Sequence, residues 1–511
     1  MKKTILIIIA FVLTLGVNAQ RVEIQKRSCC AMELDLDARP QPLYAMNNNW
    51  DASRTYRQLV VLVSFSDCDF KMDNPRNTYD AMFNQSGYNQ RDGAGCVADY
   101  FRDQSNGLFN LEFDVYGPVK VNSKAQKGSG GQDFRSSVFV EALRTLVTQQ
   151  PSIDFSLYDW NGNKVVNQVI FVYAGYAGNQ PGLTTYIWPS TGTMSTVTTP
   201  DGYQAYNYSA SGELWSNNAS CGIGTICHEF SHCLGLPDIY PTTSTTSVVS
   251  VVDEWDLMDG GHGSNLGWCP PNYSPLEKML LGWLTPTELT KDTVITGLKP
   301  VSEGGEVYLI RHTEDEYYLL ENRQWQGWDV SVPGQGLLVW HVNYNRSKWN
   351  NNVVNNTTGK PNYHLVTADN LDFDAWYDLY IERGGGNPYQ DKSRRLHRWL
   401  LSSAPYPWAT DSTDFVNREL TDTSVPVAMM YNRNAAGSYL LSKPITDITQ
   451  HDDGTISFVF QASSADGLNV PTTNEAPSAI YTLTGRKVES DAINRLPKGF
   501  YIINGKKTII R

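Results

Sequence analysis

The sequence predicts an α+β protein in which an α/β domain at residues 56–285 precedes a β-rich, sandwich-like module at 286–462. In the first region, apolar β-forming runs alternate with segments of helical periodicity, which is typical of an α/β domain. After Trp283 the pattern changes to short alternating strands that Gly, Asn and Pro interrupt. A linker by composition at 463–478 and three short strands then predict a small β domain at 479–511.

The patterns that define the first domain are of two kinds. Near-continuous or alternating β-forming apolar residues indicate strands, and apolar residues at helical spacing indicate helices. The expected strands lie at 59–65, 108–115 and 169–173. The expected helices lie at 97–105, 136–148 and 273–283. A further helix is expected between the last strand and the last of these helices, and it carries the strongest functional pattern of the chain.

The first 19 residues have the composition of a secretory signal peptide. Two lysines precede a short apolar run, and the small residue Ala19 stands directly before Gln20. No later segment approaches the roughly 18 consecutive apolar residues of a membrane-spanning helix. Residues 20–55 are polar and irregular, which favours a flexible N-terminus over a short inhibitory pro-segment. We therefore expect an exported protein without a transmembrane segment.

Composition and charge restrict the partners of this chain. Charged residues make up 18% and aromatic residues 12% of its 511 residues, with 40 Gly and 25 Pro, which suits an extracellular, loop-rich protein. The net charge of −12 disfavours nucleic acid and anionic membrane surfaces as partners. We expect a monomer.

The segment 227–238 contains H-E-x-x-H, followed three residues later by Gly and after three more by Asp. On a helix, positions i and i+4 share one face, so His228 and His232 can bind one metal ion together. Glu229 lies about 100° around the helix from His228, close enough to reach a water molecule on that metal. The pattern is typical of zinc hydrolases. The alternative is a helix whose histidines are only hydrogen-bonded, or a site that has lost its activity.

The third metal ligand is expected from the turn after this helix. Gly235 and Pro237 do not extend a helix comfortably, so the chain should turn there and return Asp238 toward the two histidines. A zinc peptidase can also take a Glu from a later segment, and Glu254 is such a residue. We favour Asp238, because Gly235 supplies the turn.

Downstream of this helix, Met258 lies on a Gly-rich turn. A methionine beneath a zinc site would form a soft, apolar floor, as in the Met-turn of metzincin peptidases. A single methionine usually belongs to the core, so this interpretation depends on its position after the metal helix.

The loop that begins at Asp159 places Asp159, Asn161 and Asn163 at alternate positions around a glycine. Oxygen ligands at this spacing resemble a calcium-binding loop. Only one of them is a carboxylate, however, and calcium prefers charged ligands. An Asn-Gly turn that leads into the next strand is the favoured interpretation.

Several motifs together resemble the secreted metallopeptidases of the immune inhibitor A family. They run in family order across residues 56–369: Val97–Gly107, Asp154–Asp159, Tyr173–Tyr176, His228–Asp238, Trp255–Met258, Glu277–Lys278, Leu281–Trp283, Leu320–Arg323 and Gly336–His341. The resemblance implies a zinc endopeptidase with a metzincin-like catalytic domain. The family often has acidic calcium ligands near Asp159, where this chain has Asn163 and Asn167. It usually has Gly where this chain has Ser231.

The last segment, 479–511, looks like a C-terminal sorting domain of type IX secretion, which implies a bacterial protein that reaches the cell surface or the medium. The secretion machinery would then be a partner through this domain. A small carbohydrate-binding appendage is the weaker alternative, because so few residues remain for a site.

The predicted function is that of a secreted zinc-dependent endopeptidase that hydrolyses peptide bonds in extracellular proteins. One zinc ion would activate a water molecule, and Glu229 would act as general base and then deliver the proton to the leaving nitrogen. Tyr273 and His262 are weak candidates for a second donor to the carbonyl oxygen. The alternative function is a cell-surface adhesin or glycan-binding protein on an inactive peptidase scaffold. That alternative draws on the tryptophans of the polar stretch 345–435, although core packing is their favoured role.

Overall fold

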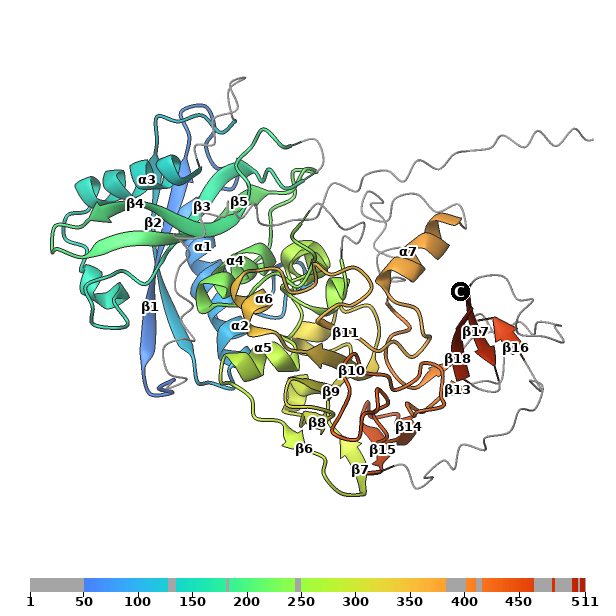
Figure 1. Ribbon diagram of the computed structural model, residues 1–511. Helices are drawn as coiled ribbons and strands as arrows, with labels where there is room; N and C mark the ends of the chain where they lie inside the picture. Colours follow the sequence, from blue (N-terminus) through green and yellow to red (C-terminus); the bar gives the residue numbers. More distant parts are fainter. Residues whose placement is uncertain are drawn as a thin grey trace, which may run out of the picture.

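The computed structural model describes residues 50–126, 135–180, 183–243, 250–382, 401–409, 416–463, 480–482, 499–503 and 506–510 (Figure 1). The predicted signal peptide at 1–19 lies outside the described residues, as do most of the predicted N-terminal segment and of the predicted linker. The described part combines helices with several sheets, which agrees with the predicted α+β class. Among the described residues, every helix is too short or too polar to cross a membrane.

The N-terminal half is built on a five-stranded sheet with the strand order β2-β1-β3-β5-β4. Its strands are β1 (Thr55–Ser64), β2 (Asn110–Lys120), β3 (Val169–Tyr176), β4 (Ser190–Thr198) and β5 (Gln204–Leu214). The first three confirm the strands predicted from apolar runs. β4 pairs antiparallel with β5 and forms one edge, whereas the other pairs are parallel. β4 and β5 were not predicted, because Ser, Thr and Gly in these strands leave no apolar pattern.

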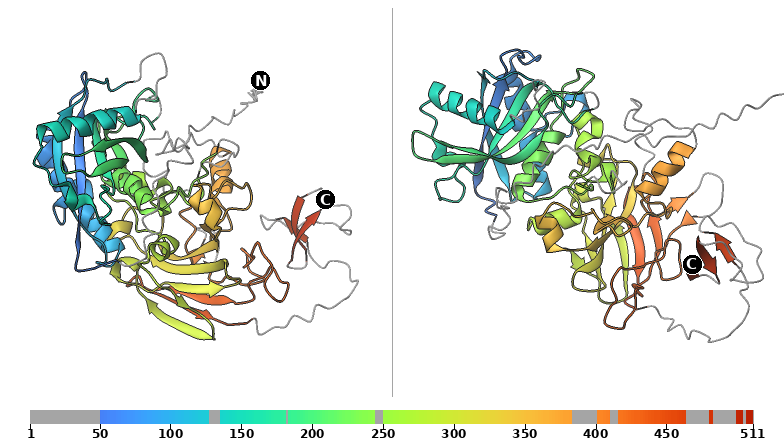
Figure 2. Two further views of the ribbon diagram at one scale, coloured as in Figure 1. Left: turned by 60° about the vertical axis from the view of Figure 1, so that its left-hand side comes forward. Right: turned by 45° about the horizontal axis from the view of Figure 1, so that its top comes forward.

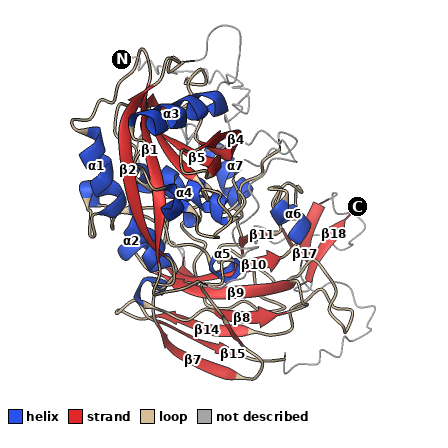
Figure 3. Cartoon of the chain, turned by 90° about the vertical axis from the view of Figure 1, so that its left-hand side faces the viewer, coloured by secondary structure: helices blue, strands red, loops and turns tan. Residues whose placement is uncertain are grey.

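Helices cover both faces of this sheet. The strand β1 shows this clearly, because its alternate side chains point to opposite faces and are buried on both. Val60 and Leu62 pack with the helices α1, α2 and α4, whereas Val61 and Val63 pack with α3. Figure 3 shows α1 and α3 on opposite sides of β1. The bounds of these helices are α1 (Pro75–Asn84), α2 (Val97–Gln104), α3 (Arg135–Gln149) and α4 (Gly224–Leu234). α2 and α3 confirm two predicted helices, and the α5 helix (Pro275–Leu280) confirms the core of a third.

The second half contains two antiparallel-rich sheets that share a hydrophobic core. The larger has the order β11-β10-β9-β8-β6 and the smaller β14-β15-β7. Side chains such as Val339 of the larger sheet and Phe458 of the smaller belong to one buried cluster. The strands are β6 (Thr287–Glu288), β7 (Thr293–Leu298), β8 (Tyr308–Arg311), β9 (Glu316–Arg323), β10 (Gly336–Asn343), β11 (Tyr363–Leu365), β14 (Ile445–Gln450) and β15 (Ile456–Phe460).

The other face of the larger sheet packs against the N-terminal half. Leu338, Trp340 and Val342 of β10 belong to the same buried cluster as α2, α4 and α5. Both faces of β10 are therefore buried, which explains its near-continuous apolar sequence. Figure 2 shows this sheet directly beneath the helices of the N-terminal half. A single core thus continues across residue 285.

The remaining elements are short. They are α6 (Arg346–Asn350), α7 (Phe373–Glu382), β12 (Trp408–Ala409), β13 (Val416–Asn417), β16 (Ile480–Thr482), β17 (Gly499–Ile503) and β18 (Lys506–Ile510). The last three form an antiparallel sheet of their own, in the segment where the sequence predicts a small β domain. The sorting role of that segment stays a prediction.

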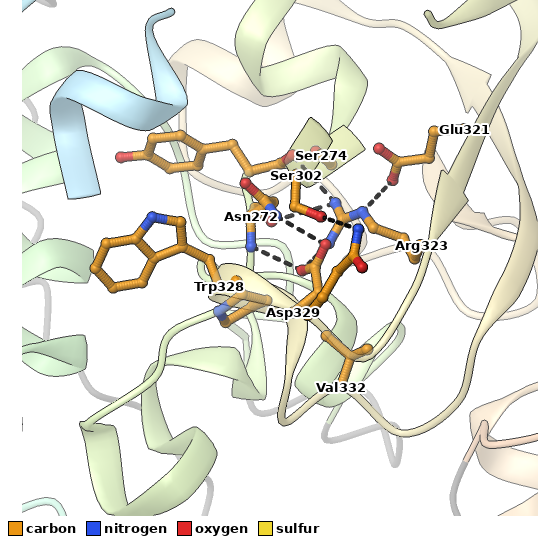
Figure 4. A network of polar contacts seen from close by, with 12 residues as sticks. Asn272, Ser274, Ser302, Glu321, Arg323, Trp328, Asp329 and Val332 are labelled. Carbon is orange, nitrogen blue, oxygen red and sulfur yellow. Dashed lines mark hydrogen bonds and ion pairs between the residues drawn. The ribbon is translucent and has the colours of Figure 1, made fainter. Parts of the chain in front are cut away.

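A buried arginine ties the two halves together (Figure 4). Arg323, at the end of β9, forms ion pairs with Asp329 at 2.8 Å and with Glu321 at 2.9 Å. The same guanidinium donates to the backbone carbonyls of Asn272 and Tyr273, which lie just before α5. Asn272 in turn donates from its amide to Asp329 at 2.7 Å. This network joins the segment before α5 to the β9 strand through charges that are fully buried.

We expect Arg323→Met to lower the free energy of unfolding by about 3–5 kcal/mol, because it leaves two buried carboxylates without their cation. Chemical denaturation of the full chain measures this change. The control is Arg311→Met, which removes a solvent-exposed ion pair with Glu288 and should cost less than about 1 kcal/mol. Equal effects of the two substitutions would contradict the structural role of Arg323.

Candidate metal centre

The metal-binding pattern lies on α4, a short and almost completely buried helix. The helix ends where Gly235 takes a left-handed conformation with φ of +104°, which glycine adopts without strain. The amide of Gly235 donates to the carbonyl of His232, and that of Leu236 donates to the carbonyl of Ser231. These two bonds are a Schellman motif, which reverses the chain after the helix. The predicted turn at Gly235 is therefore present, and it brings Asp238 back toward α4.

Three side chains converge at one point beside α4. The Nε2 atoms of His228 and His232 lie 3.1 Å apart, and each lies 3.3 Å from Oδ1 of Asp238. Among the described residues, these three form a cluster able to hold a metal ion. The alternative ligand Glu254 is not a member of that cluster.

Backbone carbonyls fix the orientation of both imidazoles. Nδ1 of His228 donates to the carbonyl of Leu257 at 2.8 Å, and Nδ1 of His232 donates to the carbonyl of Leu236 at 2.7 Å. A carbonyl only accepts, so the proton of each neutral ring is on Nδ1 and the lone pair is on Nε2. Both lone pairs thus lie at the convergence point, which is the arrangement that a metal ligand requires.

The carboxylate of Asp238 is held on one side only. Its Oδ2 accepts a hydrogen bond of 2.8 Å from the side-chain amide of Asn352, whereas its buried Oδ1 has no hydrogen-bond partner. A buried carboxylate oxygen without a donor is costly unless it faces a positive charge. Oδ1 faces the two imidazole Nε2 atoms, where a metal cation would satisfy it.

The electrostatics of the cluster favour a cation at the same point. Burial by itself would lower the pKa of His232, but the negative charges of Asp238 and Glu229 outweigh this effect and raise the pKa to about 9. Burial would likewise raise the pKa of Asp238, yet its contacts with His232 and His228 hold this pKa far below its usual value. The carboxylate thus stays charged and favours a proton on Nε2 of His232 when no metal is bound; a metal cation at the same point would take the place of that proton.

The distances between the three ligand atoms fit zinc. A tetrahedral zinc ion with bonds of about 2.0–2.1 Å needs ligand atoms about 3.3–3.4 Å apart. The observed separations of 3.1–3.3 Å are close to this value. Two neutral imidazoles and one carboxylate are also a common donor set of catalytic zinc sites, which leave a fourth position open.

Glu229 follows His228 directly and is fully buried. Its Oε2 lies 3.0 Å from the hydroxyl of Thr191 on the edge strand β4, and that hydroxyl also lies 2.7 Å from the Glu229 backbone carbonyl. The single hydroxyl proton of Thr191 is shared between these two acceptors, so the edge of the sheet contacts both the backbone and the carboxylate of Glu229. The sequence analysis missed Thr191, since it lies in a Ser- and Thr-rich strand without any motif.

Met258 is fully buried on the turn that contacts both segments with candidate metal ligands. The carbonyl of the preceding Leu257 accepts from His228, and the carbonyl of Met258 accepts from the amide of Ile239 at 2.9 Å. The turn therefore connects α4 with the loop of Asp238 through its backbone. These two backbone hydrogen bonds give the turn at Met258 a structural role, in addition to the predicted role of Met258 as an apolar floor beneath the metal.

The two weak candidates for a second donor have other partners. The hydroxyl of Tyr273 is hydrogen-bonded to that of Ser231 on α4. His262 packs edge-on against His228, with ring centroids 5.4 Å apart, and its Nδ1 donates to the carbonyl of Asp259. Both contacts support the helix, which favours structural roles for these residues.

The loop at Asp159 is organised as a turn. Oδ1 of Asp159 accepts from the amides of Asn161 and Asn163, and Oδ2 accepts from the amide of Lys164. The side-chain oxygen of Asn163 accepts from the amide of Val165. These oxygens satisfy backbone donors of their own loop, which supports the turn interpretation. Calcium binding there stays a prediction without a structural argument in its favour.

Comparisons with known proteins identify the same region. Residues 185–281, which include β4, β5, α4 and α5, match the catalytic domain of the immune inhibitor A peptidase M6 family. A protein named Immune inhibitor A, from Bacillus thuringiensis subsp. alesti, is 24% identical over 276 residues. That alignment covers 44% of this chain and 39% of the relative, so more than half of the relative's length is unmatched. These matches confirm the family resemblance predicted from the sequence.

We expect Asp238→Ala to abolish zinc retention, because only two neutral ligands would remain. Elemental analysis of the purified, dialysed protein measures the zinc content. Glu254→Ala is the matched control and should retain one zinc per chain. Full zinc occupancy in Asp238→Ala, or its loss in Glu254→Ala, would transfer the third ligand to another residue.

Proposed function

We propose that this chain, whose residues 185–281 match an immune inhibitor A catalytic domain, is a zinc-dependent endopeptidase that cleaves extracellular proteins. The observation that carries the proposal is the convergence of two imidazoles and one carboxylate within 3.3 Å of one another, next to the buried carboxylate of Glu229. The match to a peptidase family supports the same conclusion from an independent direction.

His228, His232 and Asp238 would hold the zinc ion, which when bound supplies a Lewis acid that activates water and polarises a carbonyl. Glu229 accepts the proton of the attacking water and then donates it to the leaving nitrogen. The hydroxyl of Thr191 limits the rotation of the Glu229 carboxylate, so the base meets its substrate in a fixed orientation. The carbonyls of Leu257 and Leu236 keep both histidines in the metal-binding tautomer.

The wider biology of the protein is proposed from its termini. The basic and apolar start of the chain supports export, and the C-terminal segment supports recognition by a type IX secretion system. The substrates would then be proteins or peptides at the cell surface or in the medium.

The rival function, glycan binding by an inactive scaffold, has little support from the tryptophans that motivated it. Trp349 is buried, and the indole nitrogen of Trp376 donates to Asp369 at 2.7 Å. Trp408 packs against the core of the second half, and Trp399 lies outside the described residues. Of the described tryptophans in this stretch, Trp349 is buried and the other two are partly buried against a core, which supports the packing role favoured from the sequence.

A direct assay separates the two functions. The purified protein should cleave casein, lose this activity after incubation with a zinc chelator, and regain it when zinc is added back. Mass spectrometry of the products shows internal cleavage if the enzyme is an endopeptidase. A zinc-loaded wild-type protein that leaves casein and other unfolded proteins intact would favour the rival function.

Glu229→Gln should retain zinc and lose about 10²–10⁴-fold in turnover, because the amide does not accept the proton. Zinc content and casein cleavage are measured on the same preparation. Glu112→Gln, at an exposed position on β2, is the control and should keep full activity. An active Glu229→Gln variant would contradict the mechanism.

A further inference from the structure

Asn352, from the second half of the chain, forms two hydrogen bonds with Asp238, the proposed third metal ligand. The side-chain oxygen of Asn352 accepts from the backbone amide of Asp238 at 2.6 Å, and its side-chain nitrogen donates to Oδ2 of Asp238 at 2.8 Å. The two residues are 114 positions apart, and both are buried, with exposures of 1% for Asp238 and 5% for Asn352. This pair fixes the backbone and the carboxylate of Asp238 together.

An asparagine is well suited to this position for two reasons. Its amide offers an acceptor and a donor at the same time, which the backbone N–H and the carboxylate of Asp238 require together. Asn352 also has a φ of +53°, a left-handed conformation that asparagine tolerates better than most residues. An aspartate would set one carboxylate against another, and an apolar residue would leave two buried polar groups unpaired.

Neighbouring asparagines hold the rest of the same loop. The amide of Asn355 donates to the carbonyl of Ile239 at 2.8 Å, and the side-chain oxygen of Asn356 accepts from the amide of Thr242 at 2.7 Å. The hydroxyl of Thr242 donates to the carbonyl of Asn352 at 2.6 Å. The segment 238–242 is thus bonded to the segment 352–356 at Asp238, Ile239 and Thr242. Of the three asparagines, Asn352 is the one bonded to the ligand carboxylate.

The hydrogen bond from Asn352 determines which carboxylate oxygen of Asp238 faces the histidines. With Oδ2 bound to Asn352, Oδ1 is the oxygen that lies 3.3 Å from both imidazole Nε2 atoms. Without this hydrogen bond, the carboxylate of Asp238 is free to rotate, although Asn355 and Asn356 still hold the rest of the loop. Partners of metal ligands commonly contribute 10–100-fold to metal affinity through such orientation.

We propose that Asn352 is a positioning residue for the metal centre, through which the second half of the chain completes the site on α4. The proposal rests on the proposed metal role of His228, His232 and Asp238. It adds that residues 185–281, which match the family's catalytic domain, do not include every residue of the metal site, since Asn352 lies outside them.

The test uses the full-length protein and three variants. Asn352→Gly removes the amide and suits the left-handed backbone, so the loop keeps its conformation. Asn352→Asp keeps the side-chain shape and the acceptor for the Asp238 amide but loses the donor to Oδ2. Asn356→Ala is the matched control, because its side-chain amide bonds to the backbone amide and the hydroxyl of Thr242, in the same loop but away from the ligand carboxylate. Thermal unfolding of each variant shows that it is folded.

Two measurements report on the metal site independently of catalysis. Competition with a chromophoric chelator gives the zinc affinity, and the visible spectrum of the cobalt(II)-substituted protein reports the coordination geometry. We expect Asn352→Gly to lower zinc affinity about 10–100-fold, and both Asn352 variants to change the cobalt spectrum. Asn356→Ala should keep the wild-type spectrum and the wild-type zinc affinity.

Wild-type affinity and spectra in both Asn352 variants would overturn the inference while leaving the proposed peptidase function intact. Equal losses in Asn352→Gly and Asn356→Ala would also overturn it, because the loop would then act only through stability. A wild-type protein that binds no zinc would overturn both proposals. A wild-type protein that binds zinc without cleaving casein would contradict only the peptidase function, and the affinities would still decide the role of Asn352.

Discussion

The buried carboxylate of Asp238 is the constraint on which the metal centre depends. One of its oxygens has a donor in Asn352, and the other has only the two imidazoles of His228 and His232 in front of it. Keeping such a charge away from water costs several kcal/mol unless a cation compensates it. This buried charge lies where Oδ1 of Asp238 and the two imidazole Nε2 atoms have the spacing of ligands around a tetrahedral zinc ion. This cost supports the proposed zinc site.

The arrangement also explains why the two halves of the chain share one core. β10 buries one face against the smaller sheet and the other against helices of the N-terminal half, among them α4 with its two histidines. Arg323 and Asn352 add polar contacts across the same junction, to the segment before α5 and to the ligand loop. The second half therefore acts as part of the scaffold of the site, which a purely appended binding module would not do.

Local spacing made part of this site predictable from the sequence. His228, Glu229 and His232 follow from the helical period, and Asp238 follows from a glycine that ends the helix. Thr191 and Asn352 were missed because they reach the site through contacts over 38 and 114 positions, which leave no short pattern. The strands β4 and β5 were missed for a related reason, since polar residues of a sheet edge and an enclosed site interrupt the apolar alternation.

The most direct test of the account is a crystal structure of the zinc-loaded protein with anomalous diffraction at the zinc edge. The account predicts one zinc ion bound by Nε2 of His228, Nε2 of His232 and Oδ1 of Asp238, with bonds of about 2.0–2.2 Å. Oδ2 of Asp238 should keep its hydrogen bond with Asn352. Zinc bound by other residues, or a zinc site in which Asp238 is replaced by Glu254, would contradict it.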